Sequence, residues 1–289
     1  MIKVLTIGNS FADNATHYLE KIAAADGEVE LVIGKANLGG CSLEKHWNLV
    51  KQCDLLPDVK PYRFYRTGEE PCNLSLREAL SRENWDFVTL QQVSDLSWRE
   101  ETYYPYIEKL HELVKALAPH AQVVIHQTWA YRCDADELKK YGISQAEMFQ
   151  LLKKAYENAA KKLGCRIVPC GEAFQKARAI FNYTPDRSFD FTNPQPLKLP
   201  DQSRSLIVGY YWQTGNTASG NAELHLDGRH GNAKGCYLAG AVWFEMFTGK
   251  SILDNPFCPE GVTREELAIL KNAAHQSVME YGGPLISAK

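Results

Sequence analysis

Three residues of this chain have the types and spacing needed to activate a hydroxyl group. Ser10 lies in the stretch Gly8-Asn9-Ser10-Phe11, directly after an apolar run. A serine hydroxyl is a poor nucleophile until an imidazole accepts its proton and an acid orients that imidazole. Among the eight histidines, His230 follows Asp227 by three residues, so the carboxylate can hold Nδ1 and leave Nε2 facing a hydroxyl. The pattern predicts nucleophilic catalysis by Ser10.

Each part of this pattern also has a simpler interpretation. Glycine, asparagine and serine are common in turns for conformational reasons, so Ser10 taken alone is typical of an ordinary turn. An Asp-x-x-His sequence taken alone is typical of a turn that caps a helix. Asp227 and His230 also suit zinc, although no third ligand has suitable spacing. These alternatives stay open on the residues alone.

The elements around Ser10 are expected to place it on a crossing from a strand to a helix. Residues 2–7 form a short apolar run that ends at Gly8, which is typical of a buried parallel strand. A helix capped by Asp13 or Asn14 is expected to follow and to reach Ala25. Its first N–H groups would point at the atom that the Ser10 hydroxyl attacks.

The rest of the chain predicts an α/β fold with a parallel sheet. Further strands are expected at residues 29–33, 87–90, 122–126 and 166–169, and helices at about 42–50, 75–82, 102–117, 144–163 and 172–180. Helices between strands predict right-handed crossovers with helices on both faces. We interpret residues 1–289 as one domain with excursions at about 54–72 and 182–226. The first excursion suits a hairpin, and the second shows only a short strand near 206–208. The loop 226–231 then leads into helices at 233–247 and 263–281.

In such a sheet the loops after the strands meet at one rim, where ligands bind. The rim is expected to hold Ser10, Gly39, Gln92 and Trp129. The amides of Gln91 and Gln92 are either turn residues or hydrogen-bond donors. Trp129 and the aromatic cluster 210–212, including Tyr211 and Trp212, would stack on a sugar ring or an acyl chain, or else pack an insertion against the sheet.

Composition and charge argue against several classes of protein. The net charge is −3 and no run of five or six like charges occurs, which argues against a nucleic-acid-binding surface. The eight cysteines contain no Cys-x-x-Cys spacing, so free thiols are expected. No signal sequence or transmembrane stretch is visible, so a cytoplasmic location is expected for the sequence as it stands, or a periplasmic or secreted one if a signal was removed.

Taken in chain order, these blocks resemble the SGNH hydrolase superfamily, also called GDSL esterases. Gly8–Phe11 matches its first block with Asn9 in place of the usual Asp, residues 37–39 resemble the second, and residues 227–230 the last. The LQQVS stretch carries glutamine where the family has Gly-x-Asn-Asp, as in an uncharacterised branch of the superfamily. The resemblance implies a three-layer α/β/α fold with a flavodoxin-like, five-stranded parallel sheet in the order 2-1-3-4-5.

The resemblance also implies a role for each site residue. Ser10 would be the nucleophile, His230 the general base and then acid, and Asp227 its orienter. The oxyanion hole would consist of the N–H groups of Ser10 and Gly39, with Gln92 or Gln91 in place of the usual asparagine.

The resulting hypothesis is a serine esterase that removes small acyl groups, acetyl in the first instance, from a carbohydrate or related ester. It requires no cofactor or metal and no nucleic-acid or membrane partner. The glutamines of the LQQVS stretch, which replace the family's Gly-x-Asn-Asp, keep a second hypothesis open. In this hypothesis the chain is a carbohydrate-binding or regulatory protein without turnover. A third is acyl transfer to an alcohol acceptor, which differs in excluding water from the same triad.

Overall fold

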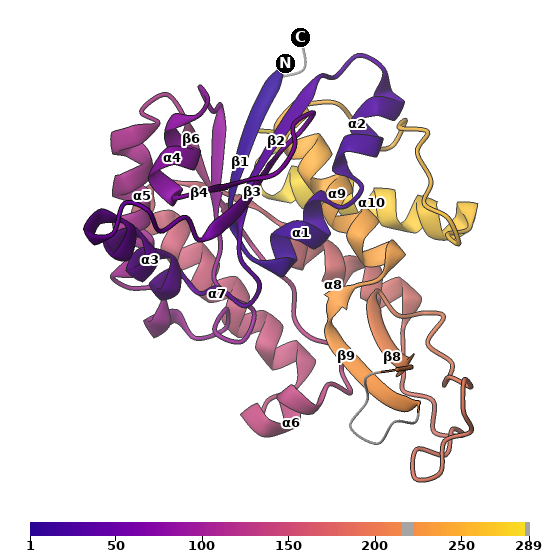
Figure 1. The fold of residues 1–289 in the computed structure, drawn as a ribbon. Coiled ribbons are helices and arrows are strands. Elements are labelled where there is room, and N and C mark those ends of the chain that lie inside the picture. Colours follow the sequence, from indigo (N-terminus) through magenta and orange to yellow (C-terminus); the bar gives the residue numbers. More distant parts are fainter. Residues whose placement is uncertain (216–221, 287–289) are drawn as a thin grey trace.

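The computed structural model describes residues 1–215 and 222–286, and its centre is a seven-stranded mixed sheet flanked by helices (Figure 1). Five strands are parallel: β1 (Ile2–Gly8), β2 (Leu31–Asn37), β5 (Phe87–Leu90), β6 (Gln122–His126) and β7 (Arg166–Val168). Strands β3 (Tyr62–Arg66) and β4 (Cys72–Leu74) are antiparallel and extend the sheet beyond β2. The strand order is β4-β3-β2-β1-β5-β6-β7.

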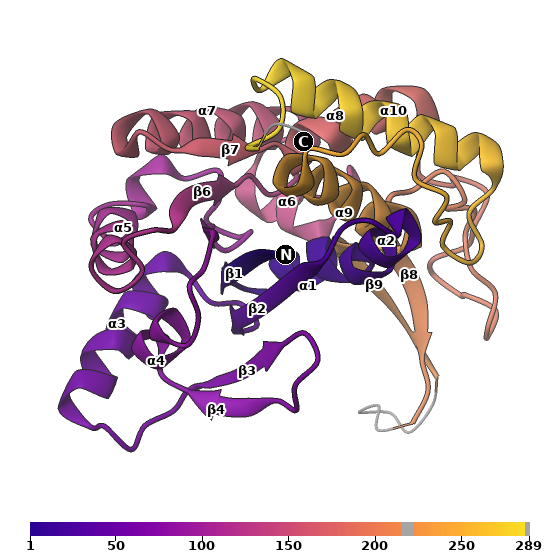
Figure 2. The same cartoon turned by 90° about the horizontal axis from the view of Figure 1, so that it is seen from above.

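Helices cover both faces of the sheet and complete three layers (Figure 2). One layer contains α3 (Leu43–Leu55), α4 (Leu76–Ser81), α5 (Tyr106–Leu117) and α7 (Gln145–Leu163). The other contains α1 (Ser10–Thr16), α2 (Leu19–Asp26), α8 (Cys170–Phe181), α9 (Ala233–Thr248) and α10 (Arg264–Glu280). Two short elements, η1 (Glu100–Thr102) and α6 (Asp136–Tyr141), lie in the connections after β5 and β6.

The core follows from the apolar runs of the central strands and of one helix. Val4, Leu5 and Ile7 of β1 are buried, since β1 pairs on both sides and is covered on both faces. Helix α9 packs against α1, α2, α8 and α10, and its residues from Lys234 to Thr248 are all buried. A helix that is apolar all round needs such surroundings, because any exposed side of it would leave apolar surface in water.

A second, two-stranded sheet stands apart from the main one. Strand β8 (Ile207–Gln213) pairs antiparallel with β9 (Glu223–Gly231), and this ribbon projects from the edge where α1 begins (Figure 1). Residues 216–221, part of the polar run expected to be loop within the excursion 182–226, lie outside the described residues. Residues 226–231, which the sequence pattern predicts as a loop before a helix, belong to strand β9 of this ribbon.

The structure corrects several expectations about these elements. The sheet has seven strands and not five, because the hairpin expected within 54–72 forms β3 and β4 and joins the sheet at β2. The second strand begins at Leu31 rather than at residue 29. The helix expected to be capped by Asp13 or Asn14 begins at Ser10, with Asn9 as its N-cap, and is interrupted after Thr16. The sequence pattern does not predict strand β9.

Candidate active site

Ser10 is the first residue of α1 and follows the end of β1 by one residue. Asn9 has an extended backbone (φ −143°, ψ −161°), and its side-chain Oδ1 accepts a hydrogen bond from the N–H of Phe11 at 3.1 Å. An asparagine in this position satisfies one of the free N–H groups at the start of a helix. Gly8 is required because a Cβ there would lie 2.9 Å from Cβ of Ala12. The local sequence thus places Ser10 at the N-terminus of α1.

His230 and Asp227 reach Ser10 from the ribbon. The ring nitrogen Nε2 of His230 lies 2.8 Å from Oγ of Ser10, and Nδ1 lies 2.8 Å from Oδ2 of Asp227. In the ribbon, Ile207 pairs with Gly231 whereas Gly209 pairs with Asp227, so β9 bulges between these two pairs. Such a bulge re-aims side chains, and here it turns His230 back over Asp227.

The Asp227 carboxylate is held in its ionised form. Burial raises its pKa, but hydrogen bonds from the His230 ring and from the N–H groups of His230 and Arg229 outweigh that effect, so the pKa falls to about 2. The stabilising contribution of these bonds is therefore present above the ordinary pKa of 3.8 and is lost as the pH falls toward 2. At neutral pH an ionised Asp227 accepts the Nδ1 proton, which leaves the Nε2 lone pair for the Ser10 hydroxyl.

Two hydrogen bonds and a ring stack hold the ribbon against the main domain. The N–H of Gly231 donates to Oδ1 of Asn14 at 2.8 Å, and Nε1 of Trp129 donates to the carbonyl of Arg229 at 2.9 Å. The Trp129 ring stacks between Phe11 and Phe174, with centroids at 4.5 and 4.3 Å. Trp129 is completely buried, so its expected role in substrate stacking is wrong. It supports the backbone on either side of the site.

The backbone N–H groups at the rim that have no partner among the described residues include the two that the family resemblance assigns to the oxyanion hole. These two belong to Ser10, at the first position of α1, and to Gly39, in the exposed turn after β2. The carbonyl of Gly8 accepts a hydrogen bond from the N–H of Leu38 at 3.1 Å, and this bond keeps the two turns adjacent. Unpaired N–H groups at a helix start and a glycine turn are suited to bind an oxyanion.

Gln91 and Gln92, which follow β5, do not face this rim, although the family resemblance implies that one of them does. Gln92 is completely buried, and its Nε2 donates to both the carbonyl and the Oγ1 of Thr102 at 3.1 Å. With both N–H bonds used there, Gln92 has none for an oxyanion, so that expectation is wrong. Gln91 is buried as well, and its Nε2 donates to Oδ1 of Asn9 at 2.8 Å. Its amide therefore supports the turn that carries Ser10.

A buried chain of polar side chains behind Ser10 was not foreseen from the sequence. Nδ1 of His126 lies 2.6 Å from Oε1 of Gln91, which in turn bonds Asn9. Burial lowers the pKa of His126 to about 3, so the ring is neutral and donates its Nδ1 proton. Asn9 also donates through Nδ2 to the carbonyl of Cys41 at 3.1 Å, which an aspartate could not do. Asn9 thereby joins the turn of Ser10 to the turn of Gly39.

The aromatic cluster of the ribbon divides between its two faces. Side chains alternate along a strand, so Asp227, His225 and the cross-strand partner Tyr211 share one face. Tyr211 is 41% exposed and stacks on His225 with centroids 5.8 Å apart. Trp212 lies on the other face, where its Nε1 donates to the carbonyl of Lys198 at 2.6 Å. Trp212 therefore packs against the excursion, as the alternative interpretation expects, and Tyr211 lies on the same face as Asp227.

The described residues contain no metal-ligand cluster, no disulfide and no membrane-spanning helix. No group of three or more His, Cys, Asp or Glu side chains among them is arranged to hold a metal ion. All eight cysteines are free thiols. Within residues 1–215 and 222–286, no helix is both long and apolar enough to span a bilayer.

Comparison with known proteins establishes the family of this chain. Residues 3–190 match the family model described as a domain of unknown function, DUF4886. The chain belongs to the DUF4886 family. A solved DUF4886 protein from Bacteroides uniformis is 28% identical, covers 96% of this chain and 95% of its own, and superposes with a TM-score of 0.73. No curated protein matches.

The DUF4886 fold is also similar to that of an SGNH-type protein. A candidate SGNH hydrolase from Slackia heliotrinireducens is 22% identical, with 84% of this chain and 97% of that chain covered and a TM-score of 0.50. At this identity the likeness concerns the fold alone. The DUF4886 chain therefore has an α/β fold like that of the SGNH hydrolases.

Proposed function

We propose that this DUF4886 protein is a serine esterase that removes small acyl groups, acetyl in the first instance, from a carbohydrate or related ester. The observation that carries the proposal is the continuous chain of two 2.8 Å contacts from Ser10 through His230 to Asp227. Nucleophile, base and orienter are recognised by this geometry rather than by position in the sequence. The fold likeness to an SGNH-type protein supports the same reaction class.

The reaction would proceed through an acyl-enzyme. As Oγ of Ser10 attacks the acyl carbon, Nε2 of His230 takes the hydroxyl proton, and the N–H groups of Ser10 and Gly39 bind the oxygen that becomes negative. The attack produces a tetrahedral intermediate. Its collapse breaks the ester bond, and His230 returns the proton to the departing alcohol. Water then attacks the acyl carbon with His230 again as base, which releases the acid and regenerates Ser10.

A fluorophosphonate probe tests the nucleophile directly. We expect wild-type protein to be labelled once and digestion with mass spectrometry to place the label on Ser10, since only an activated serine reacts readily with this reagent. Heat-denatured protein is the control and should stay unlabelled. An unlabelled native protein that binds glycans would instead favour a binding protein without turnover.

Tyr211 is proposed to bind the ring of the leaving alcohol. We expect Tyr211→Ala to raise KM for an acetylated sugar about three- to tenfold, because stacking on a ring contributes about 1 kcal/mol. The kcat for vinyl acetate, whose alcohol has no ring, should stay unchanged. Steady-state kinetics on both esters measure the difference.

Tyr211→Phe is the matched control, since it keeps the ring and removes only the hydroxyl. It should retain the wild-type KM for the sugar ester. Equal KM values for the wild type and Tyr211→Ala would remove Tyr211 from the substrate site without affecting the triad.

A further inference from the structure

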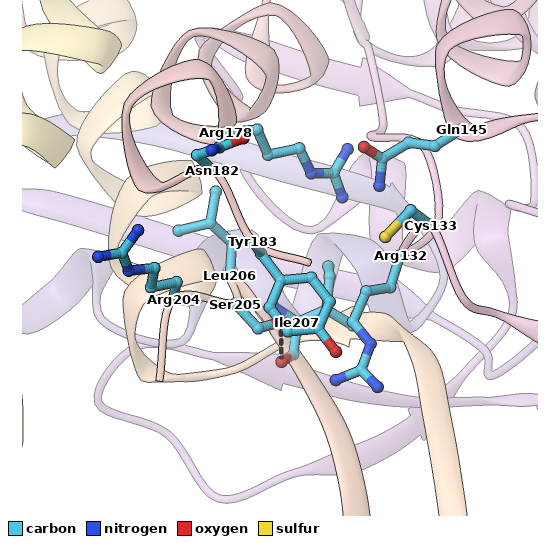
Figure 3. Close-up of a pocket in the computed structure, with 10 residues that line it drawn as sticks. All are labelled: Arg132, Cys133, Gln145, Arg178, Asn182, Tyr183, Arg204, Ser205, Leu206 and Ile207. Atoms are coloured by element: carbon cyan, nitrogen blue, oxygen red, sulfur yellow. Dashed lines mark hydrogen bonds between the residues drawn. The ribbon is translucent and has the colours of Figure 1, made fainter. Parts of the chain in front are cut away.

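A small cavity lies apart from the triad, between the C-terminal end of α8 and the base of the ribbon. Its volume is about 150 Å³, and four separate segments contribute to its lining (Figure 3). The lining residues are Arg132, Cys133, Gln145, Arg178, Asn182, Tyr183 and residues 204–207. None of the lining residues belongs to the triad or to the two oxyanion N–H groups. The cavity is therefore a site distinct from the proposed active site.

Arg178 is one of three arginines that line this cavity, and its guanidinium group lies among the other lining side chains (Figure 3). It extends from α8 toward Gln145, with the thiol of Cys133 beside it (Figure 3). Its hydrogen bonds go to two neutral acceptors, the carbonyl of Ala130 at 2.8 Å and Oε1 of Gln175 at 3.2 Å. Among the described residues no carboxylate forms an ion pair with it. Three of its five N–H bonds are thus left for a ligand.

Arg178 remains charged in this setting. Burial lowers its pKa to about 10, which still leaves the guanidinium protonated at neutral pH. A desolvated cation without a counter-ion is unfavourable, and an anion that enters the cavity would remove that penalty.

The other lining residues add to the positive charge. The lining includes three arginines, and none of its residues is acidic. Arg132 is neutralised by Asp134 through contacts of 2.6 and 2.8 Å. Arg204 is exposed, and its charge interacts with the Asp201 carboxylate. Arg178 is therefore the lining arginine that no described carboxylate neutralises.

We propose that this cavity binds a small oxyanion, a phosphate, sulfate or carboxylate group, through Arg178. The fork of N–H donors on arginine suits the paired oxygens of these groups. The volume is below the roughly 300 Å³ of pockets that bind drug-sized ligands, so it accommodates one such group rather than a whole large ligand. The inference does not depend on esterase activity.

Calorimetric titration tests the proposal with inorganic phosphate, sulfate and acetate, each at constant ionic strength with chloride. Saturable binding is expected to the wild type, and Arg178→Gln should weaken it about tenfold or more, because a charge-assisted pair is lost. Arg63→Gln removes an exposed arginine of β3 far from the lining and should bind like the wild type. Binding of phosphate or sulfate without acetate assigns a tetrahedral anion, and binding of acetate assigns a carboxylate.

Alkylation of Cys133 provides a second readout that needs no variant. Cys133 lines the cavity and Cys258 does not, while both are exposed. The bound anion should slow the reaction of Cys133 with iodoacetamide and leave that of Cys258 unchanged, as followed by peptide mass spectrometry. The proposal is overturned if none of the three anions binds and none protects Cys133. It is also overturned if a well-folded Arg178→Gln protein binds them as the wild type does.

Discussion

Ser10→Ala is expected to lose at least about 10⁴-fold in kcat on p-nitrophenyl acetate while the protein keeps its fold. The loss is large because alanine removes the only atom that can form the acyl-enzyme in this mechanism. The substitution should not disturb the structure, since Asn9 caps α1 through its own side chain and Ser10 contributes only its hydroxyl to His230. Initial rates and thermal unfolding curves measure the two quantities.

Ser94→Ala is the matched control for this result. Ser94 also follows a strand of the sheet, but its hydroxyl accepts a hydrogen bond from Tyr131 at 2.9 Å and makes no contact with His230. Its activity should remain within a few-fold of the wild type. If Ser10→Ala retains a tenth or more of the wild-type activity, Ser10 is not the nucleophile.

Asp227→Asn is expected to reduce kcat by about 10⁴-fold, with KM nearly unchanged. An asparagine can present its N–H to Nδ1 of His230, which would move the ring proton to Nε2. Nε2 would then donate toward Ser10 Oγ and could no longer take its proton. The measurement is steady-state kinetics on p-nitrophenyl acetate at neutral pH, where the wild-type carboxylate is ionised.

Asp95→Asn separates this effect of orientation from the loss of a nearby negative charge. The Asp95 carboxylate forms an ion pair at 3.3 Å with Arg229, the residue that precedes His230. Asp95 does not contact the imidazole of His230. An exposed pair of this kind contributes little, so less than about a tenfold loss is expected. Comparable losses for the two variants would mean that Asp227 acts through charge alone.

The main sheet could be predicted from the sequence because its central strands are buried on both faces. Runs such as residues 87–90 and 122–126 are apolar and short, and the strands there have those bounds. Strand β9 gave no such signal, because most of its residues are only half-buried and several are charged. Its partner β8 alternates between buried and half-buried residues only over its first four positions, so the sequence predicts only the start of this strand, near 206–208.

The positions of the site residues along the chain could be predicted from the sequence, but the directions of their side chains could not. Ser10, Gly39 and the Asp227–His230 pair could be located from strand ends and spacing. For Gln92 the choice between rim and interior depended on its contact with Thr102, ten residues further on, which no local pattern encodes. Trp129 follows a strand as a ligand-binding aromatic would, yet Phe11 and Phe174 cover both of its sides.

The connection from the ribbon to α9 has a mechanical consequence. Only Gly231 separates His230 from Asn232, which caps α9 by accepting a hydrogen bond from the N–H of Gly235 and also donates to the carbonyl of Ser205 at 2.8 Å. The imidazole thus lies at the end of the ribbon that hydrogen bonds hold against the main domain, whereas Tyr211 and His225 pair further along the ribbon. Because this held end carries His230, the 2.8 Å contact between its Nε2 and Oγ of Ser10 does not depend on the position of the Tyr211–His225 pair, so the proposed contact of Tyr211 with a ligand can vary without changing it.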